Sequence, residues 1–195
     1  MQQDKRQRIL AAAADTFATQ GFHQATIEQI ADAAGVGKGT VYLYFQNKQG
    51  LFDALLLESS QRVLSRTKEV VQAHTNPLER IRMLTHMHLQ ILKQNYPLMQ
   101  MIMREFSPDK LKDLRPELEQ HMRELMALYT LVLEEGIAAG CLRQHNPQVI
   151  ALAFLGAVNQ VGANLNNGRL QASLNECEEG LFQLFIAGLQ KEGNL

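Results

Sequence analysis

The stretch that decides the fold is Thr26 to Phe45, TIEQIADAAGVGKGTVYLYF. Its apolar residues form two sets, each on one face of a short helix, with a glycine between them. The first set is Ile27, Ile30, Ala31 and Ala34, and the second is Val36, Val41 and Phe45. Only the small residues Ala31 and Gly35 stand where the two helices must approach most closely. This pattern is typical of a helix-turn-helix, whose second helix enters the major groove of DNA.

The ends of this unit carry signals of their own. The hydroxyl of Thr26 can cap the first helix, and Gln29, three residues later, can complete a capping box. Gly35 suits the turn because a positive φ is strained for any residue that has a Cβ. These local signals favour the same two-helix unit as the apolar pattern does.

The second short helix has an unusual polar face. Its side chains offer several hydrogen-bond donors, and its glycines let the backbone come close to a partner. No acidic residue occurs from Ala33 to Phe52, although the whole chain has a net charge of −1. Many helical proteins contain two short helices joined by a glycine without binding DNA. The missing acids and the paired tyrosines favour DNA binding over that alternative.

The region from Lys5 to Leu55 resembles the TetR/AcrR family of bacterial transcriptional regulators. The matched positions are Phe17, Gly21, Phe22, Thr26, Ile30, Ala31, Ala34, Gly35, Val36, Lys38, Gly39, Tyr42, Tyr44, Phe45, Lys48 and Leu51. The resemblance implies an N-terminal three-helix DNA-binding domain and a larger helical domain that binds a ligand and dimerises. The chain departs from the family at Gly37, where serine is common. It also departs at Leu43, where an aromatic or polar residue often touches the DNA backbone.

We therefore expect a DNA-binding surface for a double-stranded operator. Its predicted residues are Thr26, Gly37, Lys38, Gly39, Thr40, Tyr42, Tyr44 and Lys48. Lys48 lies in the first turn of a helix that Asn47 is expected to cap, where a cation opposes the helix macrodipole. A nearby DNA phosphate would offset this cost. Residues 1–50 hold five basic and four acidic residues. One subunit could therefore contact only a few DNA phosphates, which fits binding as a dimer better than as a monomer.

Length and composition favour an all-α fold. The chain has 195 residues, 46% of them hydrophobic, with five prolines and long stretches of helical periodicity. We expect about nine helices, a DNA-binding domain at residues 1–46 and a ligand-binding and dimerisation domain at residues 47–195. Residues 47–73 would form a connector helix, and separate helices are expected over Pro77–Gln94 and from Pro97 to Phe106. The chain contains no run of about 18 apolar residues, so we predict no membrane span. We expect a cytoplasmic protein with Cys141 and Cys177 reduced.

The last two long helices are apolar on more than one side. A helix of this kind needs partners on both sides. We expect one side to meet a second copy of the chain, which gives a homodimer and hence a palindromic operator. The predicted interface residues are Phe154, Val158, Val161, Leu165, Phe182, Phe185 and Leu189. The alternative is that both helices lie entirely in the core of one subunit.

Seven of the eight methionines lie between positions 83 and 126. Methionine fills irregular apolar space and is common in adaptable binding surfaces. This clustering suggests a pocket for a small, lipophilic effector, although ordinary core packing is the alternative. The predicted lining residues are Met87, Tyr96, Met99, Met103, Phe106, Met122, Met126, Tyr129 and Asn159.

Other chemistry has little support in the sequence. His86 and His88 are two residues apart on a helix and point away from each other, so we predict no metal site. We also predict no cofactor and no catalytic residue, because no nucleophile has a recognisable base nearby. The predicted function is that of a ligand-responsive repressor. An activator of the same fold, a helical enzyme and a helical adaptor without DNA binding remain as alternatives.

Overall fold

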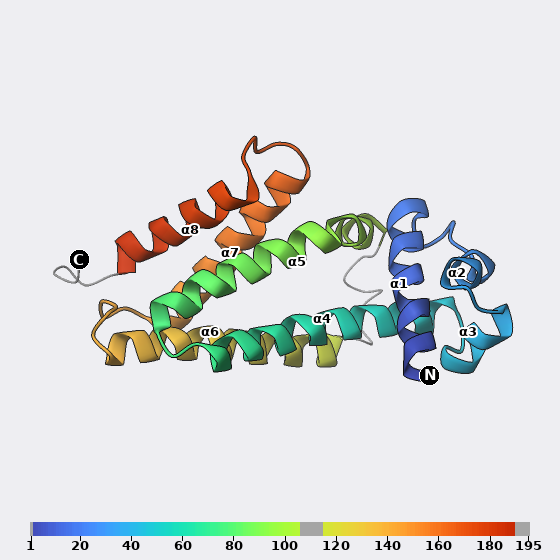
Figure 1. The fold of residues 1–195 in the computed structure, drawn as a ribbon, viewed down its shortest axis with the longest axis horizontal. Coiled ribbons are helices and arrows are strands. Elements are labelled where there is room, and N and C mark those ends of the chain that lie inside the picture. Colours follow the sequence, from blue (N-terminus) through green and yellow to red (C-terminus); the bar gives the residue numbers. More distant parts are fainter. Residues whose placement is uncertain (1, 106–114, 190–195) are drawn as a thin grey trace. The chain divides into compact units, whose positions relative to one another are not determined.

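A computed structural model describes residues 2–105 and 115–189, which form helices joined by turns and loops (Figure 1). The side chains of residues 2, 3, 103, 104 and 115 are outside that description. The eight helices are α1 (Gln2–Gln20), α2 (Ile27–Ala34), α3 (Lys38–Tyr44), α4 (Lys48–Ala73), α5 (Pro77–Glu105), α6 (Arg115–Ala138), α7 (Pro147–Asn166) and α8 (Leu174–Leu189). The prediction of an all-α fold is confirmed.

The predicted break before Pro97 is wrong, because α5 continues through this proline. An internal proline lacks an N–H and displaces the carbonyl four residues earlier, which here belongs to Lys93. Both Pro97 and Lys93 are exposed, so water can solvate that carbonyl. The buried side chains of Leu92, Leu98 and Met101 hold the helix on either side. The described chain therefore has one helix fewer than expected.

The chain divides into two compact units. The first comprises Met1–Gln61 and Asn95–Glu119, and the second comprises Arg62–Gln94 and Gln120–Leu195. Three helices, α4, α5 and α6, run from one unit into the other. The division therefore follows packing and does not coincide with a single boundary in the sequence.

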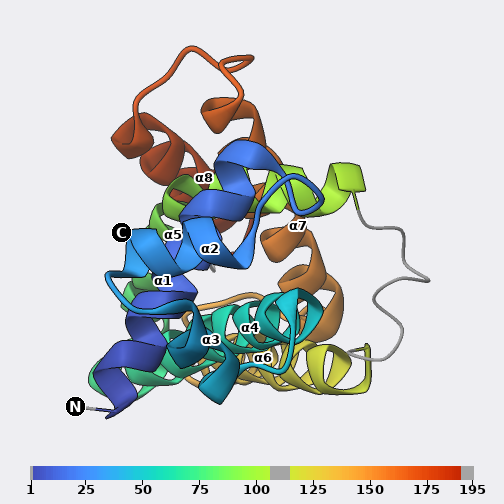
Figure 2. The ribbon, with the colours of Figure 1, turned by 90° about the vertical axis from the view of Figure 1, so that its right-hand side faces the viewer.

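Aromatic side chains form the centre of the first unit. Phe17, Phe22 and Phe52 pack with ring centroids 5.1 to 5.8 Å apart, which fixes α1 against the first turns of α4. Both ribbon views show α2 and α3 beside α1 (Figures 1 and 2). Leu98 and Met101 of α5 also belong to this core. Burial on this side leaves the opposite side of α3 for solvent.

The second unit has a core of its own, built from α4 to α8. Among the described helices α7 is long and apolar enough to cross a membrane by length and composition. Five of its residues, Ala151, Phe154, Leu155, Val158 and Gly162, are buried in the unit, and a core helix passes the same test. A Cβ on Gly162 would lie 2.7 Å from a methyl of Leu92, so this glycine lets α7 approach α5.

A candidate DNA-binding surface and a candidate effector cavity

The turn between α2 and α3 has the predicted local geometry. The Thr26 hydroxyl accepts a hydrogen bond from the Gln29 N–H at 3.2 Å, and the Gln29 side chain accepts one from the Thr26 N–H at 2.9 Å. Gly35 ends α2 with φ of 62°, in the left-handed region. The N–H groups of Gly35 and Val36 donate back to the carbonyls of Asp32 and Ala31, each at 3.0 Å. The predicted capping box at the start of α2 and the predicted glycine turn at its end are confirmed.

Arg8 of α1 strengthens this turn from outside. Its guanidinium donates to the carbonyl of Ala34 and, at 3.1 Å, to that of Gly35. A cation at this place stabilises the C-terminal end of α2, where carbonyl groups lack helical partners. No local sequence pattern predicts this contact, because 26 residues separate Arg8 from Ala34.

The polar face of α3 divides into an exposed and a half-buried side. Lys38 and Tyr42 are exposed, whereas Thr40 and Tyr44 are half-buried. Gly37 precedes the helix without any side-chain cap, and a Cβ built on Gly37 or on Gly39 would meet nothing within 4 Å. The donors predicted to face DNA therefore do not lie on a single line.

Lys38 already has an anionic partner. Its ammonium forms an ion pair with Glu28 of α2 and lies 5.9 Å from the centre of the Tyr42 ring. The hydrogen bond between the two side chains lowers the pKa of Glu28 and raises the pKa of Lys38. Both side chains are about half exposed, so the pair is open to exchange with a phosphate or a base edge.

Lys48 binds backbone carbonyls of the loop between α1 and α2, a role that local sequence patterns do not predict. Its ammonium donates to the carbonyls of Phe22 at 2.8 Å, His23 at 3.2 Å and Ala25 at 2.8 Å. A lysine has three donors, so these carbonyls use all of them. These three hydrogen bonds explain why a cation lies in the first turn of α4 without a DNA phosphate beside it. Asn47 caps that helix as predicted, accepting from the Gly50 N–H at 2.8 Å.

The other side of the same loop is held by α5. The carboxylate of Glu105 accepts a hydrogen bond from the Phe22 N–H at 2.8 Å. Phe22 is therefore bonded through its N–H to the end of α5 and through its carbonyl to the start of α4. Sequence reasoning missed Glu105, because 83 residues separate it from Phe22.

The methionine cluster does not line one pocket. Met99, Met122 and Asn159 are exposed, and Tyr96 and Met126 are half-buried. Met87 is buried beside an open groove between α4 and α5. The Met103 side chain and Phe106 lie outside the described residues. Of the predicted lining residues that are described, Tyr129 alone faces the enclosed cavity of the second unit.

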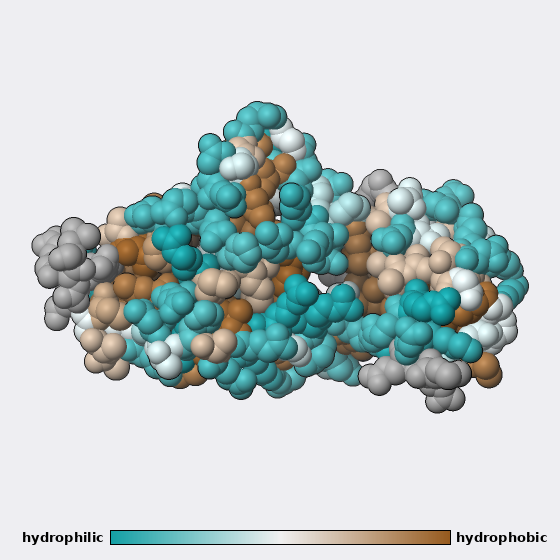
Figure 3. Space-filling view, viewed as in Figure 1, coloured by the Kyte–Doolittle hydropathy of each residue, from teal (hydrophilic) through white to brown (hydrophobic). Residues whose placement is uncertain are grey.

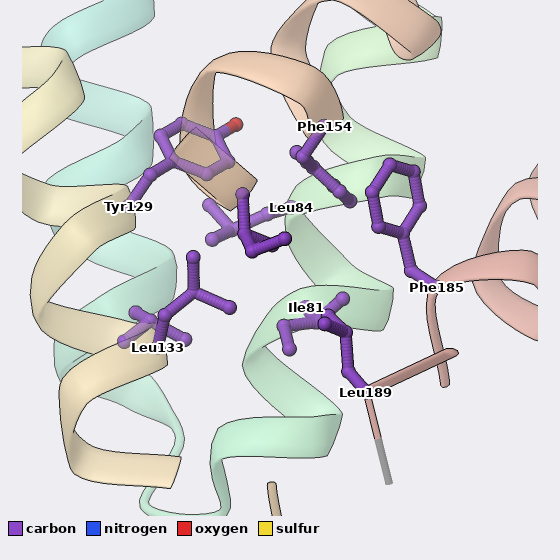
Figure 4. Close-up of a pocket in the computed structure, with 9 residues that line it drawn as sticks. Ile81, Leu84, Tyr129, Leu133, Phe154, Phe185 and Leu189 are labelled. Carbon is purple, nitrogen blue, oxygen red and sulfur yellow. The ribbon is translucent and has the colours of Figure 1, made fainter. Parts of the chain in front are cut away.

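That cavity lies among four helices and has a volume of about 10 Å³, room for about one water molecule. Figure 4 shows side chains from α5, α6, α7 and α8 pointing into it. The lining residues are Ile81, Leu84, Tyr129, Val132, Leu133, Ile150, Phe154, Phe185 and Leu189. The Tyr129 hydroxyl is the only polar side-chain group among them.

Tyr129 shares a buried hydrogen bond with His88. The hydroxyl oxygen lies 2.5 Å from the Nδ1 atom of His88, and both side chains are buried. Burial lowers the pKa of His88 to about 4 and raises the pKa of Tyr129 well above its ordinary value. The pair is therefore neutral near pH 7, as an apolar core requires.

The residues predicted for a dimer interface lie mostly on the inner side of α7 and α8. Phe154, Val158 and Leu189 are buried within their own subunit, and the rings of Phe154 and Phe185 pack 5.0 Å apart. Val161, Leu165, Phe182 and Phe185 are half-buried against the same core. The structure thus uses these residues for packing inside the subunit, because the apolar stripe with the largest side chains faces the core.

A different side of both helices is exposed and apolar. Leu152 and Leu184 are each 66% exposed, and a Cβ on Gly156 or Gly188 would meet nothing within 4 Å. In the space-filling view, hydrophobic side chains gather at the end of α8 near the C-terminus (Figure 3). This side is the more exposed of the two and is available to another molecule.

No group of three or more histidine, cysteine or acidic side chains within residues 2–105 and 115–189 is placed to hold a metal ion. What the described residues do present is an exposed α3 behind a fixed turn and an apolar cavity in a second unit. These features define a helix-turn-helix protein whose second unit holds a small apolar cavity.

Comparison with known sequences agrees with this class. Residues 9–55 match the model of bacterial regulatory proteins of the tetR family, and residues 74–163 match the model of the tetracyclin repressor-like C-terminal domain. The chain belongs to the TetR family. It is therefore a transcriptional regulator and not an enzyme.

Relatives of known function are regulators as well. The fatty acid metabolism regulator protein of Bacillus subtilis is 27% identical over 140 residues, which is 72% of each chain. The transcriptional repressor KstR2 of Mycolicibacterium smegmatis is 26% identical over 142 residues, 71% of this chain and 68% of the relative.

Solved structures share the fold over nearly the whole chain. The fatty acid degradation regulator FadR from Bacillus halodurans has a TM-score of 0.78 at 26% identity, over 94% of this chain and 95% of its own. FadR from Bacillus subtilis, solved in complex with stearoyl-CoA, has a TM-score of 0.76 at 22% identity, over 93% of this chain and 98% of its own.

Proposed function

We propose that the protein is a ligand-responsive repressor that binds a palindromic operator as a homodimer in the cytoplasm and is released by a lipophilic effector. The observation that carries the DNA-binding part is the exposed, acid-free face of α3 behind its fixed turn. Lys38, Thr40, Tyr42 and Tyr44 would contact the groove and its phosphates, and Thr26 would contact the backbone from the start of α2. Gly37 and Gly39 would let the backbone of α3 approach closely. Lys48 acts indirectly, by holding the loop that leads into α2.

Anisotropy with labelled DNA from upstream of the protein's own gene tests this part. We expect an affinity that falls steeply with salt and a footprint with two-fold symmetry. A matched DNA of scrambled sequence should bind far more weakly. Equal binding to both DNAs at every salt concentration would contradict an operator-specific repressor. A reporter whose expression rises with the protein would point to an activator instead.

Dimerisation is supported by the exposed apolar side of α7 and α8. Two helices from each subunit would form an isologous four-helix interface, with Leu152 and Leu184 facing the second copy. Two-fold symmetry of the protein then predicts two half-sites about one helical turn apart, or somewhat more. A single sedimenting species of monomer mass at micromolar concentration would contradict this arrangement.

The cavity supports a lipophilic effector. A molecule that fills it meets an entirely apolar surface, so a charged metabolite would lose its hydration without compensation. Because the space is small in this structure, binding must part the side chains of α5 to α8. A slim alkyl chain needs the least opening. Stearoyl-CoA, the molecule bound to FadR from Bacillus subtilis, carries such a chain.

A homologous series of acyl compounds tests the effector class. Each added methylene should tighten binding by up to about fourfold until the cavity is filled. The rise in thermal stability would report binding, and release of labelled operator would report the response. A response confined to small, highly charged metabolites would contradict the proposal.

Release of DNA requires coupling between the two units. Three of the described helices, α4, α5 and α6, run from one unit into the other, so they are the route we propose. The effector can shift the separation of the two α3 helices only if it binds one separation more tightly than the other. Operator DNA must then weaken effector binding by the same factor.

A further inference from the structure

Gly39 and Leu43 lie in a line along α3, on the side of the helix opposite its buried face. Each α-helical residue advances by about 100° around the axis, so residues two positions on either side of Val41 point away from it. Val41 is fully buried in the core of the first unit. Lys38 and Tyr42 therefore lie on one flank of this line.

Leu43 is 84% exposed, the highest value among the large exposed hydrophobic side chains of the described chain. A single exposed leucine is common on protein surfaces and by itself means little. Its place on the helix is what matters here. When a recognition helix enters the major groove, the side chains farthest from the protein's own core reach the base edges, and the flanking ones reach the strands.

Gly39 lies one helical turn before Leu43 and adds no side chain to the line. A Cβ at this position would meet nothing within 4 Å, so the glycine is not required by packing inside the protein. Its effect is to leave Leu43 as the single side chain projecting from this line. Without a side chain at Gly39, the backbone of α3 can lie deep in the major groove of DNA.

The chemistry of leucine restricts what it can read. It has no donor or acceptor, so it cannot bond a phosphate or a polar base edge. The major groove offers one apolar group, the 5-methyl of thymine. We infer that Leu43 is a specificity-determining residue that contacts a thymine methyl group in each half-site. This inference rests on the proposed binding of DNA through α3.

The test removes that methyl group and nothing else. Once the operator is mapped, each thymine of a half-site is replaced in turn by deoxyuridine, which keeps the pairing and loses the methyl. At one thymine, or at two adjacent ones, the unaltered protein should bind about fourfold more weakly per half-site. Leu43→Ala should bind the thymine and uracil operators equally well. Leu131→Ala, which removes an exposed leucine of α6, should keep the full discrimination.

Two results would overturn the inference. In one, Leu43→Ala retains the same sensitivity to uracil as the unaltered protein. In the other, Leu43→Ala weakens binding equally on all operators while no uracil substitution matters, as expected for a leucine packed on deoxyribose. Failure of the unaltered protein to bind any operator would instead refute the proposed function, so the two failures are distinguishable.

Discussion

The hydroxyl of Tyr129 and the Nδ1 atom of His88 lie 2.5 Å apart in a core that is mostly apolar. Each side chain supplies the partner that the other needs in order to be buried. Tyr129 also lines the cavity through its ring, so this bond holds one wall of the cavity in place. Core stability and effector preference therefore depend on the same pair.

The pair predicts a dependence of stability on pH. The pKa of His88 is about 4 in the folded protein and about 6.5 when unfolded, so the unfolded chain binds the extra proton between these values. The contribution is complete above pH 6.5 and is lost as the pH falls toward 4. Between pH 7 and pH 5 we expect the free energy of unfolding to drop by about 2 kcal/mol. Denaturant titrations at several pH values measure it.

His88→Gln is the control for this dependence. It removes the titrating group, so its stability should fall less over the same interval, by a difference of about 2 kcal/mol. Identical pH profiles for the variant and the unaltered protein would show that His88 does not titrate in this way. Tyr129→Phe should cost about 1 to 3 kcal/mol at pH 7, because it leaves Nδ1 of His88 without its partner.

Lys48→Met tests whether Lys48 supports the loop between α1 and α2. The variant keeps most of the aliphatic stem and leaves the carbonyls of Phe22, His23 and Ala25 without a donor. We expect a loss of about 2 kcal/mol in stability and weaker operator binding with an unchanged salt slope. A slope lower by about one would reveal a phosphate contact. Lys93→Met, at an exposed position of α5, should leave stability nearly unchanged.

Gly39→Ala should separate folding from DNA binding. The added methyl meets nothing in the free protein, and alanine favours a helix by up to about 1 kcal/mol over glycine. We therefore expect a higher Tm together with at least a tenfold loss of operator affinity. Gly37→Ser is the matched comparison, since it adds a helix cap and a hydroxyl in equally open space. Unimpaired binding by Gly39→Ala would mean that the DNA does not approach this turn of α3.

Leu184→Asp tests the proposed subunit interface. The side chain is 66% exposed within the subunit, so an aspartate there should leave the fold intact. In a dimer it would bury an unpaired charge, and we expect monomers in analytical ultracentrifugation together with weaker operator binding. Leu131→Asp on α6 is the control and should remain dimeric. A dimeric Leu184→Asp would exclude this face.

Local signals made the first unit predictable. Thr26, Gln29 and Gly35 interact within a few residues, so their geometry follows from spacing alone. The contacts of Arg8, Lys48 and Glu105 join positions 23 to 83 residues apart, and spacing carries no information about them.

In the second unit, composition shows that α7 and α8 are apolar on more than one side, but it does not show which side faces the core. Phe154 and Leu152 are both apolar, and packing against α5 and α6 decides that the larger ring is buried. A proline often marks the start of a helix, but Pro97 does not, because buried residues on either side hold α5 together. The bond between His88 and Tyr129 joins two helices and has no counterpart in local sequence.

The recognition helix is only seven residues long, carries a glycine at its cap and another in its first turn, and has no side-chain cap. A segment this short is marginal in isolation, so its order depends on the buried Val41 and Phe45 and can increase when the exposed side binds DNA. Calorimetry of operator binding should accordingly record a more negative heat-capacity change than the docking of a rigid surface would give. Affinity for DNA in this protein is then partly a measure of how completely one helix folds.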